Sequence, residues 1–208
     1  MTEDNRSNHP GLKMQAARSV AWTSFAQVGA QLIALIGTPI LARALLPEDF
    51  GVVVTVGILT GLVTLLGEFG LGAAIIYRQD VTQEHIATSY WFNIVVGALL
   101  TTVTILGAPL AAEYFHNPLV RPVAYALSFT FLINSFSWAH GCLMMKDLQF
   151  KAMAIINIGS IALRVIVSVV LAVQFDMGVW ALVYGELAKT VVSSIARFFA
   201  HPWRPVFT

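Results

Sequence analysis

The chain has 208 residues, of which 57% are hydrophobic and only 11% are charged, and its formal net charge at pH 7 is +1. A soluble domain carries about 25% charged residues, so this composition predicts an integral membrane protein, and it offers no basic patch that would suggest a nucleic acid partner. The single cysteine, Cys142, excludes an internal disulfide.

Six predominantly apolar runs are each long enough to cross a bilayer, which takes about 20 residues. They fall at residues 19–42, 51–76, 88–112, 122–145, 152–174 and 178–200. Short polar connections separate them, and Pro47, Pro118 and Pro122 lie at predicted helix ends, where proline is tolerated best. We therefore predict an all-α, polytopic transmembrane bundle of six helices over residues 18–200.

The Lys and Arg residues of the connections predict the orientation, because cytoplasmic connections carry an excess of them. Eight lie on the side of the two termini: Arg6, Lys13, Arg18, Arg78, Lys146, Lys151, Arg197 and Arg204. Only Arg43 and Arg121 lie on the other side. We expect both termini in the cytoplasm, with residues 1–17 as a polar cytoplasmic tail.

The other two cations, Arg164 and Lys189, lie near the middle of the fifth and sixth runs. A charged side chain at the bilayer centre costs about 2.5–3.5 kcal/mol on insertion scales, and such residues usually face the bundle interior. Because both are cationic, we expect them to hold an anion inside the bundle.

Polar residues recur at helical spacing in four runs, so that they share one face in each. The four sets are Ser24, Gln27, Gln31 and Thr38; Thr60, Thr64 and Glu68; Asn157, Ser160, Arg164 and Ser168; and Glu186, Lys189, Thr190 and Ser193. Lipid satisfies no hydrogen bonds, so each set needs protein or water opposite it.

Two interpretations of these polar faces compete. In the first they only join helices, with Glu186 neutralising Lys189 and Glu68 pairing with Arg164. In the second they line a water-filled cavity for an anionic or amphiphilic substrate, which we favour because four helices contribute and the two cations lie at similar depth. The predicted substrate-binding residues are Arg164, Lys189, Glu68, Gln27, Gln31, Asn157 and Glu186.

The glycines of the second run have a simpler interpretation. Gly57 and Gly61 lie one helical turn apart, and Gly70 and Gly72 follow near the end of the run. Small residues let neighbouring helices approach closely in membranes. We therefore expect close helix packing at these positions.

Motifs of known enzyme chemistry are absent from the sequence. The five histidines are scattered singly, without an HExxH pair or a Cys/His cluster, and there is no phosphate-binding glycine loop and no GxSxG. We therefore predict no metal site, no cofactor and no enzymatic activity. His140 is interpreted as a packed polar residue rather than a proton relay.

The connections resemble a known family. The string ILARALLPEDFG at 40–51 and the string EFGLGAAIIYRQD at 68–80 are similar to those of bacterial polysaccharide exporters and lipid-linked oligosaccharide flippases. These are the Wzx-type members of the multidrug/oligosaccharidyl-lipid/polysaccharide exporter superfamily. FHNP, KDLQFK, GVWALVYG and the closing HPWRP follow in the same order, so the resemblance covers about residues 18–207.

The resemblance implies a function in the bacterial cytoplasmic (inner) membrane. Such proteins move glycans carried on undecaprenyl pyrophosphate from the cytoplasmic to the periplasmic leaflet, by alternating access between two six-helix lobes around a cationic cavity. They serve lipopolysaccharide and exopolysaccharide synthesis. Arg164 and Lys189 match the kind of cation that would meet the pyrophosphate, and residues 201–208 match the start of the linker between lobes.

Family members usually have twelve or more spans, whereas six are predicted here. The expectation is therefore an N-terminal lobe, from a truncated or split gene or from a homodimer of lobes, which would not transport without a second lobe. Two alternatives remain open: a non-transporting scaffold subunit of a polysaccharide assembly complex, and a dimeric exporter of small molecules.

Overall fold

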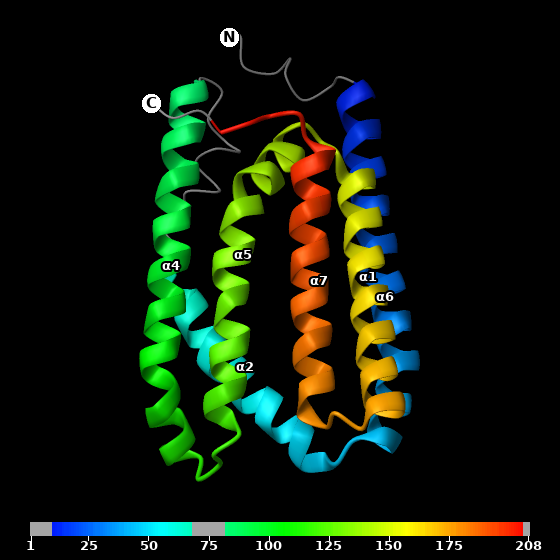
Figure 1. Cartoon of the computed structure of the whole chain (residues 1–208). Coiled ribbons are helices and arrows are strands. Elements are labelled where there is room, and N and C mark those ends of the chain that lie inside the picture. Colours follow the sequence, from blue (N-terminus) through cyan, green and yellow to red (C-terminus); the bar gives the residue numbers. More distant parts are fainter. Residues whose placement is uncertain (1–9, 68–81, 206–208) are drawn as a thin grey trace, which may run out of the picture.

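The structure is a computed structural model that describes residues 10–67 and 82–205, with side chains placed from 22 to 65 and from 82 to 205. Within these ranges the regular elements are all helices. They are α1 (Pro10–Ala44), α2 (Pro47–Gly67), α4 (Gln83–Tyr114), α5 (Val120–Lys146), α6 (Phe150–Phe175) and α7 (Val179–Ala200). The predicted all-α class is confirmed, and successive helices run in opposite directions, so that α1 begins and α7 ends at the same end of the bundle (Figure 1).

Two boundaries differ from the prediction. Residues 10–17 were expected in the polar tail, but α1 already begins at Pro10. Apolarity marks only the part of a helix that crosses a bilayer, while Leu, Lys, Met, Gln and Ala in this stretch are good helix formers and proline suits the first helical position. In the second run, α2 is described to Gly67, and residues 68–76 with Glu68, Gly70 and Gly72 lie outside the described residues.

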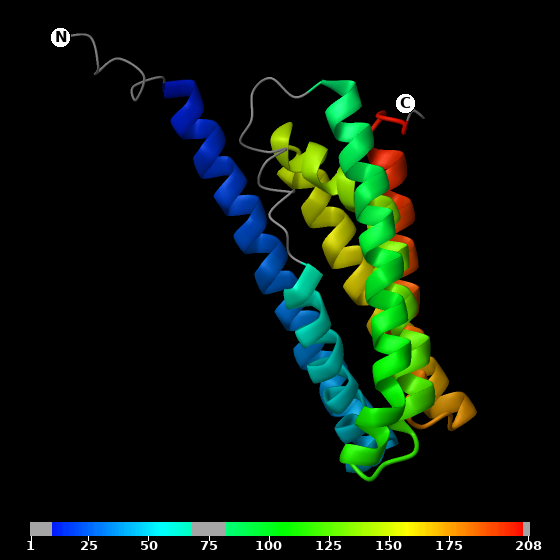
Figure 2. The same ribbon diagram turned by 90° about the vertical axis from the view of Figure 1, so that its left-hand side faces the viewer.

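The helices form a row in the order α4, α5, α7, α6, with α1 packed on α6 (Figure 1). Helix α2 crosses this row obliquely and contacts α5, α4 and α7. Figure 2 shows that α1 and α2 both lie on the same side of the layer made by α4, α5 and α7. The spatial order departs from the chain order, because α7 lies between α5 and α6.

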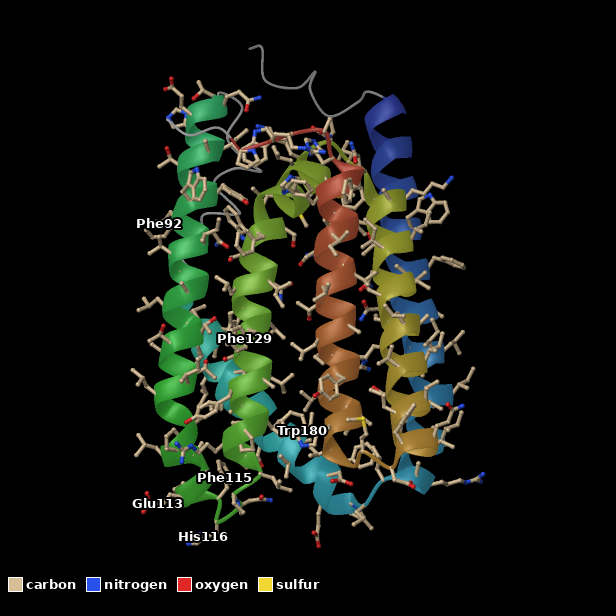
Figure 3. All side chains as sticks on the ribbon, viewed as in Figure 1. Phe92, Glu113, Phe115, His116, Phe129 and Trp180 are labelled. Atoms are coloured by element: carbon tan, nitrogen blue, oxygen red, sulfur yellow. The ribbon has the colours of Figure 1, made fainter. Side chains whose placement is uncertain are left out.

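Five of the six helices, all except α5, are long and apolar enough to cross a membrane. Many of their apolar side chains are exposed, and Phe92 of α4 points away from the bundle (Figure 3). Helix α5 carries several polar residues, which lower its apolarity and are buried against neighbouring helices. Thr101 of α4 donates to the Ser128 carbonyl at 3.1 Å, and Ser137 donates to Ser194 of α7 at 3.1 Å. The chain is thus a multi-pass membrane protein with α5 near its centre.

At the end where α1 meets α2, two of the strings noted in the sequence come together. The Leu46 amide donates to the Asp49 carboxylate at 3.1 Å, beside the start of α2, where a negative charge is favourable. A Cβ placed on Gly178, which has φ +54°, would lie 3.4 Å from the same carboxylate. The Asp49 carboxylate therefore lies close to both the α1–α2 and the α6–α7 connections.

At the opposite end, the segment that follows α7 folds back over α5 and α4. His201 Nε2 lies 3.0 Å from the Asp147 carboxylate after α5, and Trp203 Nε1 donates to Gln83 of α4 at 2.7 Å. The Trp203 ring packs against Tyr90 and His140, with ring centroids 5.6 and 5.4 Å apart. We call residues 201–204 the C-terminal strap.

Candidate functional site

The intramembrane charges gather into one cluster between α6 and α7. Arg164 of α6 places Nη1 3.4 Å from Glu186 Oε2, and Lys189 of α7 places Nζ 2.7 Å from Glu186 Oε1. The three side chains keep 40%, 33% and 32% of their surface exposed, for Arg164, Lys189 and Glu186 respectively. Glu186 is therefore a carboxylate held between two cations.

The cluster carries one more positive charge than negative. The Lys189–Glu186 contact agrees with the packing interpretation, but the partner of Arg164 in the described part of the chain is Glu186, and Glu68 lies outside it. The Nε of Arg164 is buried and has no hydrogen-bond partner among the described residues. Because the contact to Glu186 is long and engages only Nη1, the guanidinium of Arg164 keeps donor capacity for another acceptor.

A pocket of about 470 Å³ opens beside this cluster. Arg164, Ser168 and Glu186 line it together with residues of α1, α2 and α5, among them Thr38, Thr60 and Thr130. The volume lies within the 300–1,000 Å³ typical of ligand pockets. Lys189 is not in the lining, so it acts on the pocket through Glu186.

Close helix contacts shape this pocket, but not at the predicted glycines. A Cβ on Gly57 or Gly61 would have nothing within 4 Å among the described residues, so the close packing expected there is not found in this part of the chain. The tight positions are Gly185, where a Cβ would collide with Ser168 Oγ and lie 2.9 Å from the Arg164 carbonyl, and Gly37, where it would lie 2.5 Å from Val165. Which glycine faces a neighbouring helix depends on the partner helix, which spacing alone does not identify.

Most hydroxyls of the predicted polar faces are satisfied within their own helices. Thr38 donates to the Ala34 carbonyl at 2.8 Å, Thr64 to the Thr60 carbonyl at 2.8 Å, and Ser160 to the Ile156 carbonyl at 2.7 Å. Such i to i−4 bonds are a usual way for Ser and Thr to satisfy their donors in membrane helices. These residues therefore do not decide whether the polar faces line a cavity or only join helices.

The remaining predicted residues lie elsewhere. Gln27 of α1 and Asn157 of α6 line a second pocket, which also contains Arg197 of α7. Gln31 is exposed on α1 and belongs to the lining of neither pocket. The sequence interpretation counted Arg197 among the cytoplasmic charges, although a signal was present: it continues the polar face of α7, four residues after Ser193. Of the seven predicted residues, three thus lie at the charge cluster, two line the second pocket, Gln31 lies at neither place and Glu68 is outside the described residues.

Similarity to known proteins assigns this amino-acid sequence to a family. The sequence profile of a family described as polysaccharide biosynthesis protein matches residues 40–208. The chain belongs to this family. The resemblance expected from the connecting strings is confirmed, and the matched region contains both pockets apart from their α1 residues before position 40.

Several curated relatives agree with this assignment. This polysaccharide biosynthesis protein is 23% identical over 184 residues to the lipopolysaccharide biosynthesis protein WzxC of Escherichia coli, covering 88% of this chain and 37% of the relative. It is 26% identical over 196 residues to the succinoglycan biosynthesis transport protein ExoT of Rhizobium meliloti, covering 86% and 35%. It is 24% identical over 151 residues to the teichuronic acid biosynthesis protein TuaB of Bacillus subtilis, covering 73% and 31%. The aligned part is therefore only 31–37% of each relative's length, and no solved structure matches the chain.

Proposed function

We propose that this chain is one six-helix lobe of a transporter that moves a lipid-linked glycan from the cytoplasmic to the periplasmic leaflet of a bacterial cytoplasmic membrane. The glycan would be carried on undecaprenyl pyrophosphate, and both termini of the lobe would be cytoplasmic. One observation carries the proposal: Arg164 and Lys189 share the single carboxylate of Glu186 at the edge of a pocket of about 470 Å³. The family supports polysaccharide as the substrate class.

The excess charge favours binding over packing. A cluster that serves only to join helices would be neutral, because every uncompensated charge at bilayer depth adds about 2.5–3.5 kcal/mol to the cost of insertion. Here one positive charge remains after Glu186 is counted against both cations. A pyrophosphate would supply the missing negative charge.

Arg164 is the better direct ligand of such an anion. Its guanidinium is fixed at one end by Glu186 and leaves Nε unpaired in the described part of the chain. Arginine binds phosphate oxygens with two parallel donors, and hydrogen bonds to charged groups contribute about 1.5–3 kcal/mol each. Lys189 holds Glu186 from the other side at 2.7 Å, so that the carboxylate does not fully neutralise Arg164.

Transport by alternating access needs a second bundle that rocks against this one. Gln31 of α1 supports the presence of such a partner. Its amide side chain is exposed, and lipid would offer it no hydrogen bonds. The second bundle would come from further helices of the same polypeptide, from a second copy or from another chain. It would bring its own face to α1 and α2 and close the pocket.

The test replaces each of the two cations of the cluster in a complete transporter. Arg164→Ala and Lys189→Ala should abolish glycan export in a flippase-null strain while membrane levels stay unchanged, because removing a charge does not hinder insertion. Arg164→Lys should retain part of the activity, since the charge remains but the two-donor geometry is lost. Arg121→Ala, at an exposed cation outside the pocket, is the matched control and should remain active. Full export by both alanine variants would leave only the packing role.

A further inference from the structure

A second pocket lies away from the charge cluster, near the end of the bundle where α5 ends and α6 begins. Its volume is about 220 Å³. Four helices line it with residues that fall into a polar and an apolar group: Thr23, Gln27, Asn157 and Arg197, and Ala26, Met145, Phe150, Met153 and Ala154. None of these side chains takes part in the glycan binding proposed above, although Gln27 and Asn157 were predicted from the sequence to do so.

The polar half of this pocket is suited to an anion. Arg197 is the one charged residue in the lining, and none of the three ion pairs found in the described ranges includes it. Gln27 and Asn157, whose amides each carry an NH₂ donor, line the same space. A half-buried guanidinium beside two amides and no lining carboxylate is a binding site for a singly charged group such as a phosphate diester.

The apolar half and the depth of the pocket indicate that this phosphate belongs to a lipid. Met145 is the penultimate residue of α5, Phe150 is the first residue of α6, and Arg197 is in the last turn of α7. Nearby, Lys151 lies 5.7 Å from the centre of the Trp22 ring, and such Trp and Lys side chains anchor helices at the membrane interface. The pocket is thus at headgroup level, on the end that the charge bias assigns to the cytoplasm.

We propose that the Arg197 pocket binds the phosphate headgroup of an anionic phospholipid of the cytoplasmic leaflet. Basic pockets between transmembrane helices on the cytoplasmic side are a known means of headgroup recognition. The phosphate contacts Arg197, Gln27 and Asn157, and the first part of an acyl chain lies along Met145, Phe150 and Met153. A volume of 220 Å³ corresponds to about seven water molecules at roughly 30 Å³ each, which accommodates a phosphate group and excludes an oligosaccharide.

Lipid adducts counted by native mass spectrometry on the purified full chain test this site without measuring transport. Phosphatidylglycerol should bind with a dissociation constant at least tenfold below that of phosphatidylcholine, and Arg197→Gln should remove that preference. A factor of ten corresponds to about 1.4 kcal/mol. Arg197→Lys should restore most of it, because the positive charge remains. The controls are Lys151→Gln at the same end and Arg43→Gln at the opposite end, both exposed cations that should keep the full preference.

The other outcomes are also decisive. A second variant, Gln27→Leu with Asn157→Leu, leaves Arg197 in place and should weaken phosphatidylglycerol binding several-fold. It tests the site even if Arg197→Gln does not fold. Millimolar inorganic phosphate should not displace the lipid; if it displaces the lipid fully, the site binds free anions and the lipid assignment is wrong. Equal loss of preference in Lys151→Gln and Arg197→Gln would mean general attraction to the basic end, and would also overturn the proposal.

Discussion

Gly185 is the position where a single methyl group should most clearly separate α6 from α7. It precedes Glu186 in α7, and an added Cβ would collide with Ser168 Oγ while lying 2.9 Å from the Arg164 carbonyl oxygen. Because that oxygen is a backbone atom of a packed helix, it cannot move aside without shifting α6. The Gly185→Ala substitution should therefore widen the helix pair at the level of the Arg164–Glu186 contact.

The expected cost follows from two opposing effects. Overpacking a close contact costs about 1–3 kcal/mol, and a backbone obstacle places this site in the upper part of that range. Alanine is a better helix former than glycine and returns up to about 1 kcal/mol. We expect a net loss of about 1–2 kcal/mol. Gly159→Ala in α6, where a Cβ would meet nothing within 4 Å among the described residues, should show only the gain in stability of up to about 1 kcal/mol from helix propensity.

The chain contains its own reporter for this measurement. Cys142 is the only cysteine in the sequence and is 8% exposed, so a dye that fluoresces on reacting with thiols labels it as the bundle opens. The two alanine variants should differ by about 2–3 kcal/mol, which for a chain of this size corresponds to about 4–12 °C in melting temperature. A thermal melting curve recorded with this dye in detergent therefore resolves the difference in stability between the two variants.

A double variant identifies the obstacle. Ser168→Gly removes the side chain that the new methyl group would strike, so Gly185→Ala with Ser168→Gly should lose less stability than the sum of the two single changes. The contact with the Arg164 carbonyl remains, and the rescue should be partial. If Gly185→Ala melts at or above the wild-type temperature, the close approach of α6 and α7 at this level is refuted.

Three further outcomes are expected. In a background without the native cysteine, Asn117→Cys and Asp176→Cys should react with an impermeant thiol reagent from outside intact cells and Gln149→Cys should not; the reverse pattern would invert the predicted orientation. Trp203→Ala should lower stability by about 3–5 kcal/mol in the same dye assay, because the side chain is 7% exposed and packs on two helices; a loss below 1 kcal/mol would mean that the strap is not held. Asp49→Ala should cost about 1 kcal/mol through the lost contact with the Leu46 amide, and Asp49→Asn should recover part of it.

The sequence predicted the helices well because length and apolarity decide whether a segment can cross a membrane. The ends of α4 and α7 lie within a few residues of the predicted runs. As expected, Pro47 lies at a helix end, as the first residue of α2, and Pro118 lies in the connection between α4 and α5. The start of α1 was missed, since helix propensity continues where apolarity stops. The sequence interpretation also did not distinguish α5 from the more apolar helices. Its central position depends on contacts with α4, α2 and α7 together, which the sequence alone does not show.

The candidate site was predicted only in part because side-chain periodicity gives the face of a helix and not its neighbour. Arg164, Glu186 and Lys189 do meet, since α6 and α7 are consecutive and pack along their length. Gln27 and Asn157 were assigned to the same cavity but line another pocket with Arg197. That division arises from the position of α1 on α6 and of α7 between α5 and α6.

The C-terminal strap also has a consequence for the making of the protein. The hydrogen bond from Trp203 to Gln83 joins residues 120 positions apart. At a synthesis rate of about 5–20 residues per second, the ribosome needs about 6–24 s to deliver Trp203 after Gln83 has been made. During that interval the first turns of α4 and the ring of Tyr90 have no strap to pack against. A membrane insertase or chaperone that covers this end of α4 would act in that interval, which ends when residues 201–204 become available to pack on α4.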